Sequence, residues 1–263
     1  MKLSIGADAR VFARAFGCHV NWHIGNFERA TQLSEEGIAR ARAMEDPFTL
    51  AIALDYAAMR HQFDHNNLVA RKLSKEAIEL CTEHQFAYYL AWARIIYGWT
   101  TICVGENAVG LAEISAGIDE FEATGAGLRL PYYLSLLADG QNRGGRPEKA
   151  LATVDLALQR ANTNGEKWHN ADLFRLRAQI LLQMNSGNTS DAETAFQGAL
   201  NISREQCCKA RELQISTELG RLWQSQGKQR DAHDLVAAIY GYFPSSSESV
   251  YLNNAKALLE ESS

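Results

Sequence analysis

Two pairs of histidines are the residues whose spacing most suggests chemistry. His19 and His23 are four residues apart, as are His61 and His65, so on a helix the members of each pair share a face. Imidazole nitrogens bind zinc, but a zinc site needs three or four converging ligands, and no third ligand follows at a fixed spacing. We therefore predict no metal site and interpret these histidines as residues that line a groove or face solvent.

Catalytic motifs are equally weak. The nearest approach to a phosphate-binding loop is Gly220–Gln229, where the glycine spacing is wrong and Gln replaces the required Ser or Thr. Adjacent acids such as Glu35 and Glu36 fit a solvated helix surface, because acid–base catalysis needs a cleft and shifted pKa values. We predict that the chain is not an enzyme, has no catalytic residue and binds no cofactor.

Composition narrows the classes of partner and compartment. The net charge is -5, with acids and bases interspersed, so the chain lacks the basic stripe of a nucleic-acid surface. It has no apolar run of roughly 18 residues or more, so no membrane partner is expected. The five cysteines are odd in number and form no CxxC pair, which favours a reducing compartment. With no signal peptide visible at the start, we expect a cytoplasmic location.

The elements that position these side chains follow from an internal repeat. Small anchor residues recur at successive spacings of 40, 40, 40, 42 and 40 residues, and a second small residue follows seven positions later in five of the six repeats. Positions seven apart share a helix face, so a neighbouring helix can approach closely. Five residues before each anchor stands a glycine, or His65 in the second repeat, as a tight turn requires. The anchors are Ala30, Ala70, Gly110, Ala150, Ala192 and Ala232.

Six such helix pairs cannot each bury a core alone, so neighbours must stack. We predict an all-α fold, a right-handed α-solenoid of about six helix pairs plus a C-terminal capping helix, formed by a single domain over residues 1–263. The predicted repeats cover 8–44, 47–83, 86–123, 130–163, 166–205 and 208–242, and the cap covers 248–261.

The predicted first helix has an apolar face without an earlier helix to cover it. This face carries Val11, Phe12, Phe16 and Val20. Either a neighbouring helix is missing or this face meets another domain, and we therefore expect that the chain is a C-terminal piece of a longer protein.

The run Gly25-Asn-Phe27-Glu-Arg-Ala30, followed by Gly37, resembles the tetratricopeptide repeat. That family has a period of about 34 residues, so the longer period here implies longer helices. The period alone would also suit HEAT or armadillo repeats, but the offsets fit the tetratricopeptide pattern better.

A narrower resemblance covers nearly the whole chain. The stretches 86–99, 129–134 and 222–228 resemble a group of bacterial signalling proteins in which such a solenoid follows an ATPase module. Class III adenylate or guanylate cyclase domains, or DNA-binding domains, often stand at the N-terminus of that group. The resemblance implies a regulatory or sensor segment, with any cyclase or ATPase activity outside these residues.

In tetratricopeptide arrays the first helix of each pair lines the concave surface, and the resemblance implies a similar groove here. We expect an aromatic end and an arginine-bearing end, because exposed aromatic rings suit peptide side chains and a guanidinium can bond two oxygens of an anion. The candidate residues are His19, Trp22, His23, Asp55, Met59, Gln62, Phe63, Trp92 and Trp99 in the first half, and Tyr132, Asp139, Arg143, Arg175, Gln179, Arg221 and Gln224 in the second. For Trp22, Trp92 and Trp99, burial between repeats is the favoured interpretation.

Three functions remain open at this point. The leading hypothesis is an interaction scaffold that acts as a sensor in a bacterial signal-transduction protein. It would bind a protein, a peptide or a small anionic effector, and upstream domains of the same polypeptide would read the change. The second is a stand-alone adaptor that binds a partner's tail in the groove, and the third is an enzyme whose site the sequence does not reveal.

Overall fold

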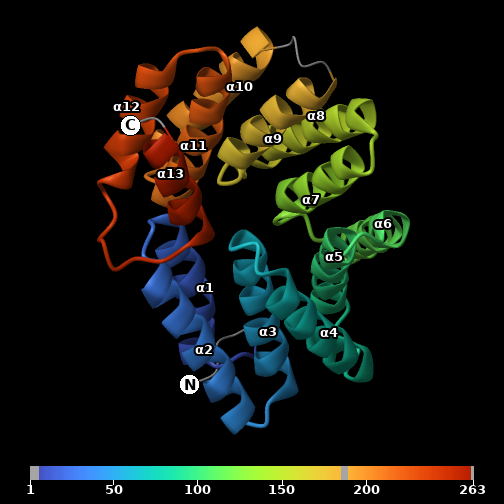
Figure 1. Ribbon diagram of the computed structural model, residues 1–263. Helices are drawn as coiled ribbons and strands as arrows, with labels where there is room; N and C mark the ends of the chain where they lie inside the picture. The colour runs from blue at the N-terminus through green and yellow to red at the C-terminus, as the bar shows by residue number, and fades with distance from the viewer. Residues whose placement is uncertain (1–5, 185–188, 262–263) are drawn as a thin grey trace.

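A computed structural model describes residues 6–184 and 189–261, and within these ranges it contains thirteen α-helices and no strand (Figure 1). The predicted all-α solenoid of six helix pairs and a cap is confirmed, and the helix ends lie within four residues of the expected ones. The helices are α1 Ala9–His23, α2 Phe27–Ala43, α3 Pro47–Phe63, α4 Asn67–Glu83, α5 Ala87–Cys103, α6 Asn107–Ala123, α7 Leu130–Arg143, α8 Pro147–Asn164, α9 Asn170–Met184, α10 Thr189–Glu205, α11 Lys209–Ser225, α12 Gln229–Tyr240 and α13 Val250–Glu261.

A residue with left-handed backbone conformation stands at almost every helix junction. The expected turn residues inside the pairs have positive φ, from 54° at His65 to 96° at Gly105. A second set of positive-φ residues lies between the pairs, 20 residues after the expected turn residues of the first five pairs. The sequence does not predict this set, because three of its members are not glycine. Gly187 lies outside the described residues. The two sets are Gly25, His65, Gly105, Gly145 and Gly227, and Glu45, Gln85, Gly125, Gly165 and Cys207.

The helices form two layers. Each of α1, α3, α5, α7 and α9 packs against the next odd-numbered helix, while each even-numbered helix up to α12 packs against its neighbours in sequence on the outer side. Small residues allow close approach between the layers. A Cβ atom on Gly110 would lie 2.5 Å from the carbonyl oxygen of Gly98, so α5 and α6 meet backbone to backbone.

The tryptophans of the first three pairs belong to the core. Trp22, Trp92 and Trp99 expose at most 1% of their surface, so their rings lie in the core between repeats. They belong to one hydrophobic cluster whose buried residues come from both ends of the chain, from Ala7 to Leu258.

The two ends of the solenoid meet. Figure 1 shows α1 beside α11 and α13, and the rings of Phe27 and Phe243 stack with their centroids 5.8 Å apart. The hydroxyl of Tyr251 in α13 donates a hydrogen bond to the carbonyl oxygen of Phe63 at the end of α3. The helices therefore make one closed turn.

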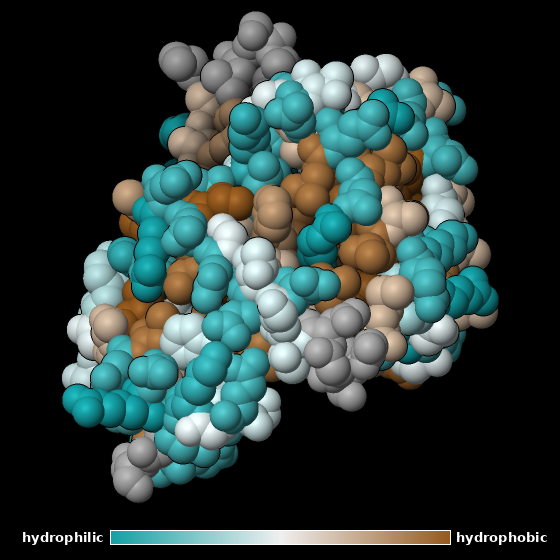
Figure 2. Space-filling view, turned by 90° about the horizontal axis from the view of Figure 1, so that it is seen from above, coloured by the Kyte–Doolittle hydropathy of each residue, from teal (hydrophilic) through white to brown (hydrophobic). Residues whose placement is uncertain are grey.

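The apolar face of α1 is only partly covered. Val11 is fully buried, whereas Phe16 and Val20 expose 41% and 56% of their surfaces. Seen from above, the molecule shows hydrophobic residues between hydrophilic ones across much of its surface (Figure 2). Within the described residues, every helix is too short or too polar to cross a bilayer.

Candidate functional site

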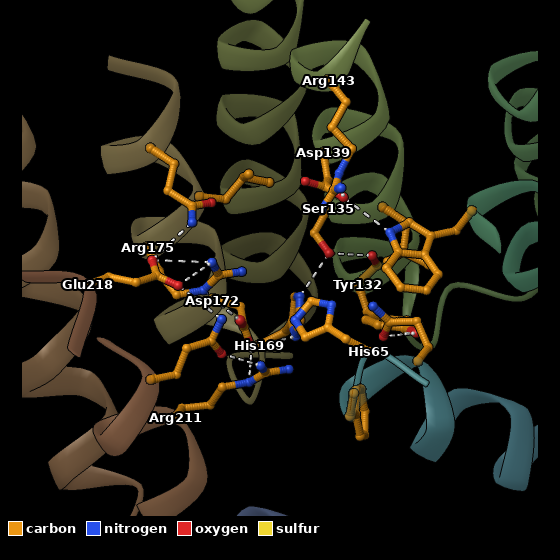
Figure 3. Close-up of a pocket in the computed structure, with 17 residues that line it drawn as sticks. His65, Tyr132, Ser135, Asp139, Arg143, His169, Asp172, Arg175, Arg211 and Glu218 are labelled. Carbon is orange, nitrogen blue, oxygen red and sulfur yellow. Dashed lines mark hydrogen bonds and ion pairs between the residues drawn. The ribbon is translucent and has the colours of Figure 1, made fainter. Parts of the chain in front are cut away.

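The inner helices enclose a polar pocket at the centre of the closed turn (Figure 3). Its volume is about 140 Å³, and its walls come from α3, α5, α7, α9 and α11, with His65 and His169 from the adjoining turns. We call this the central pocket. Its lining by the first helices of the pairs agrees with what the tetratricopeptide resemblance implies for a concave surface.

A buried carboxylate, Asp172, organises one wall of the central pocket. Its oxygens lie 3.2 Å from the Nε atom of Arg175 and 2.5 Å from the Nε atom of Arg211. Burial by itself would raise the pKa of Asp172, but the two guanidinium groups and His169 outweigh it and lower this pKa to about 2. Asp172 is therefore an ionised anchor that holds α9 against α11.

Glu218 holds the opposite side of the same network. Its carboxylate accepts hydrogen bonds from Arg175 at 3.2 Å, from Gln179 at 3.0 Å and from Gln214 at 3.1 Å. Burial raises the pKa of Glu218 and Arg175 opposes that shift. The side chains of α9 and α11 are thus fixed to one another before any ligand arrives.

Ser135, His169 and Asp172 lie in the order of a catalytic triad, but one of its two links is not made. The Ser135 hydroxyl lies 2.6 Å from the carbonyl oxygen of Tyr132 and 2.8 Å from His169 Nε2, so two acceptors share its single proton. His169 Nδ1 lies 3.6 Å from Asp172, too far for a hydrogen bond. The carboxylate therefore does not orient the imidazole as it does in a catalytic triad.

The arginines expected to attract an anion are already paired. Arg143 contacts Asp139 at 2.8 Å, Arg175 contacts two carboxylates, and Arg221 lies 3.9 Å from Glu261. The central pocket as a whole is lined by three arginines and three carboxylates. An anion would meet compensated charge here, so the structure argues against the arginine-bearing end as a site for a small anionic effector.

The structure divides the predicted groove residues among several places. Arg221 lines a neighbouring pocket, Trp22 and Asp55 are buried in the core, and Gln224 is half-buried outside the central pocket. His19, His23 and Met59 line a separate apolar cleft. Those that meet in the central pocket are Gln62, Phe63, Trp99, Tyr132, Asp139, Arg143, Arg175 and Gln179.

Several important residues of the central pocket were not predicted from the sequence. The spacing of Asp172 and Arg175, three apart on one helix, was a usable signal for an ion pair. Trp99 and Asp139 are 40 residues apart and hydrogen-bonded at 3.1 Å, so equivalent positions of adjacent repeats come into contact. His65 lines the pocket, as the interpretation of the histidine pairs allowed, and the unpredicted lining residues are Ser135, Leu136, His169, Asp172, Leu176, Arg211, Gln214 and Glu218.

The histidine pairs do not converge on one point. His19 donates from Nε2 to the carbonyl oxygen of Tyr56 at 2.8 Å, and His23 contacts the Cys208 thiol at 3.2 Å. His61 lies against the Arg60 guanidinium instead. Across residues 6–184 and 189–261, no group of three or more His, Cys, Asp or Glu side chains is placed to hold a metal ion.

Comparison with solved structures identifies the architecture. The apo form of RapI superposes with a TM-score of 0.63 at 13% identity, over 96% of this chain and 85% of that one. A Rap protein complexed with Competence and Sporulation Factor gives 0.66 at 12% identity, over 96% and 74%. A STAND protein with a tetratricopeptide repeat sensor, from Pyrococcus horikoshii, gives 0.51 at 15% identity, over 96% and 42%.

The chain has a tetratricopeptide-like fold. At these identities the likeness concerns the architecture alone, and it agrees with the resemblance that the glycine and alanine offsets indicate. No protein-family model and no curated protein matches the chain. What this tetratricopeptide-like solenoid binds must therefore be argued from its own side chains.

Proposed function

We propose that this solenoid is a non-catalytic regulatory scaffold that binds a peptide or a segment of a partner protein in the central pocket. One observation carries the proposal: Phe63 and Arg211 belong both to the wall of the pocket and to the junction between the chain's two ends. The carbonyl oxygen of Phe63 accepts the Tyr251 hydrogen bond, and Arg211 lies 4.6 Å above the ring of Trp22. A ligand that moves Phe63 or Arg211 also changes how the ends meet.

The charge balance favours a ligand that carries both donors and acceptors. A peptide can exchange its own amide and charged groups for the contacts among Arg175, Asp172 and Glu218, leaving no buried group without a partner. A lone anion cannot do so, because it would separate paired charges and leave a carboxylate uncompensated. The solved neighbours support this class of function, since one is a complex with Competence and Sporulation Factor and another carries a repeat sensor.

The finer proposal is that this scaffold is the sensor segment of a larger bacterial signal-transduction protein. Its alternative is a stand-alone adaptor that binds a partner's tail. The coding sequence upstream of residue 1 separates the two, because an ATPase module encoded there in frame supports the sensor.

The test uses a variant that fills the central pocket and a matched variant that does not. Gln179 lines the pocket, whereas Gln183 lies one turn further along α9 and does not line it. Wild type, Gln179→Trp and Gln183→Trp serve as parallel baits for lysate of the source organism, with bound proteins and peptides identified by mass spectrometry. A captured peptide is then synthesised and titrated into all three proteins by calorimetry.

We expect a ligand that binds wild type and Gln183→Trp equally and Gln179→Trp at least tenfold more weakly, a difference of about 1.4 kcal/mol. Equal binding to all three proteins would refute the assignment to the central pocket. If the protein converted the bound ligand into a chemical product, the proposal of a non-catalytic role would be refuted.

A further inference from the structure

A second cleft, of about 560 Å³, lies apart from the central pocket. Its walls come from α1 and α3 and from the connections that precede α7, α9 and α11. Phe16, Val20 and Leu128 stand at its surface with 41%, 56% and 55% of their areas exposed, and Met59 and Trp168 line it further in. We call it the α1 cleft. Its lining is mainly apolar, and its volume lies within the range of small-molecule sites.

One cation, Arg129, lines this apolar cleft, and its position is rigidly set. Its backbone has φ 70°, and its N–H donates to both carboxylate oxygens of Glu166, at 2.7 and 2.9 Å. The guanidinium donates to the hydroxyls of Tyr88 at 3.1 Å and Tyr56 at 2.5 Å, and it lies 4.4 Å from the centroid of the Trp92 ring. The side chain is therefore held in an aromatic cage instead of moving freely at the surface.

Arg129 has no carboxylate partner for its guanidinium within the described part of the chain. Glu166, the acid at the rim, is occupied by the backbone of Arg129 and by the indole N–H of Trp168 at 2.7 Å. Asp55 is the other acid that interacts with Arg129, but no hydrogen bond joins them, and burial raises the pKa of Asp55 well above its usual range.

The other titratable groups of the cleft do not offset this charge. Burial lowers the pKa values of His19 and His23 to about 3, so both imidazoles are neutral near pH 7. The two tyrosine contacts use two of the five guanidinium N–H groups. A buried cation without an anion is costly, and a ligand carboxylate that reaches it gains a charge-assisted pair of bonds.

We propose that the α1 cleft binds a small amphipathic monocarboxylate of medium chain length, with its carboxylate on Arg129 and its hydrocarbon chain against Phe16, Val20 and Leu128. Charge complementarity selects an acid, because Arg129 is the one permanently charged residue among those that line the cleft. The apolar lining selects a hydrocarbon tail over a polar body. This site is separate from the central pocket, so it stands or falls independently of the function proposed above.

The test titrates octanoate into the full chain by calorimetry, with octan-1-ol as the uncharged ligand of equal chain length. Val20→Glu places a carboxylate in the mouth of the cleft at an exposed position, where the fold tolerates it. Val109 on α6 is exposed to nearly the same degree, 54% against 56%, and does not line the cleft, so Val109→Glu is the matched control. Val20→Leu keeps the surface apolar.

We expect octanoate to bind wild type, Val20→Leu and Val109→Glu with equal affinity, and Val20→Glu at least tenfold more weakly. Octan-1-ol should bind wild type at least tenfold more weakly than octanoate does. Absence of octanoate binding to wild type would overturn the proposal, as would equal affinity for the alcohol and the acid. Tighter binding of a peptide ending in a free leucine carboxylate would also overturn it, by showing a polypeptide site.

Discussion

The hydroxyl of Tyr251 donates a hydrogen bond to the carbonyl oxygen of Phe63, which precedes it by 188 residues. The bond joins the last helix to the second helix pair. Contacts in an array of stacked repeats usually stay between neighbours, so this one depends on the summed curvature of all six pairs. A change in the packing of any repeat would therefore alter the contact between Tyr251 and Phe63 at the junction.

Gly25 tests the junction directly. It has φ +88°, and a Cβ atom there would lie 2.6 Å from Cε1 of Phe243, whereas Gly145 has φ +72° and nothing within 4 Å of an added Cβ. Gly145→Ala should cost about 1 kcal/mol of unfolding free energy from backbone strain alone. We expect Gly25→Ala to cost at least about 1 kcal/mol more, because overpacking against Phe243 is added to the same strain.

Urea unfolding measures the two losses, and small-angle X-ray scattering should show a larger radius of gyration for Gly25→Ala only. Equal losses and equal radii would mean that the ends do not meet in solution.

Asp55 is a carboxyl group in the core, and neither of its oxygens has a hydrogen-bond partner. Burial raises its pKa well above the usual range, with Arg129 opposing the shift. The folded chain thus holds this proton more tightly than the unfolded chain, and its contribution to stability is lost as pH rises from the ordinary carboxyl range through the folded pKa. Asp55→Asn should raise the unfolding free energy by about 2 kcal/mol at alkaline pH, with less gain near the ordinary carboxyl pKa. A gain that is the same at both pH values would contradict this account.

His23 gives the opposite dependence on pH. Burial lowers its pKa to about 3, with Arg211 adding to the shift, so the unfolded chain takes up a proton first as pH falls. Its contribution to stability is present above the ordinary histidine pKa of about 6.5 and is lost as pH falls toward the folded value. His23→Phe should flatten the fall in unfolding free energy below neutral pH. The matched control is His233→Phe, at a histidine whose side chain is 40% exposed, and a flattening of equal size in both variants would contradict the assignment to His23.

The contacts among Arg175, Asp172 and Glu218 should behave as one coupled unit. Arg175→Met leaves two carboxylates buried without their shared cation and should cost about 3 kcal/mol of unfolding free energy. Adding Glu218→Gln removes one of those charges, so the double variant should be more stable than the sum of the single losses predicts. A double-mutant cycle by urea unfolding measures this coupling, and strict additivity would show that the residues do not interact.

The architecture could be predicted from the sequence because it rests on local spacing. The anchor column from Ala30 to Ala232 and the turn residues such as Gly25 fix where helices begin and which faces touch. Each of these anchor and turn residues acts within one or two repeats, so the sequence pattern alone indicates its role. The second set of left-handed positions cannot be predicted in the same way. Glu45 and Gln85 belong to it, and these residue types do not indicate a left-handed turn.

The site could be predicted only in part, because closure depends on many repeats at once. The rotation from one pair to the next cannot be read from a 40-residue period, yet it decides that Arg211 lies over Trp22. The predicted groove residues therefore lie on the inner helices, but only some of them line the central pocket. The sequence does not show that Arg143 and Arg175 are paired with carboxylates, and Arg129 is not among the predicted groove residues because it stands at a helix start.

Because the first and last described helix pairs touch, adding or removing a repeat would break more contacts here than in an open repeat array. Duplicating or deleting a 40-residue pair would carry Tyr251 away from Phe63 and split the wall that holds the central pocket. An insertion or deletion of one pair would thus be tolerated only if the contact between the first and last described helix pairs were repacked.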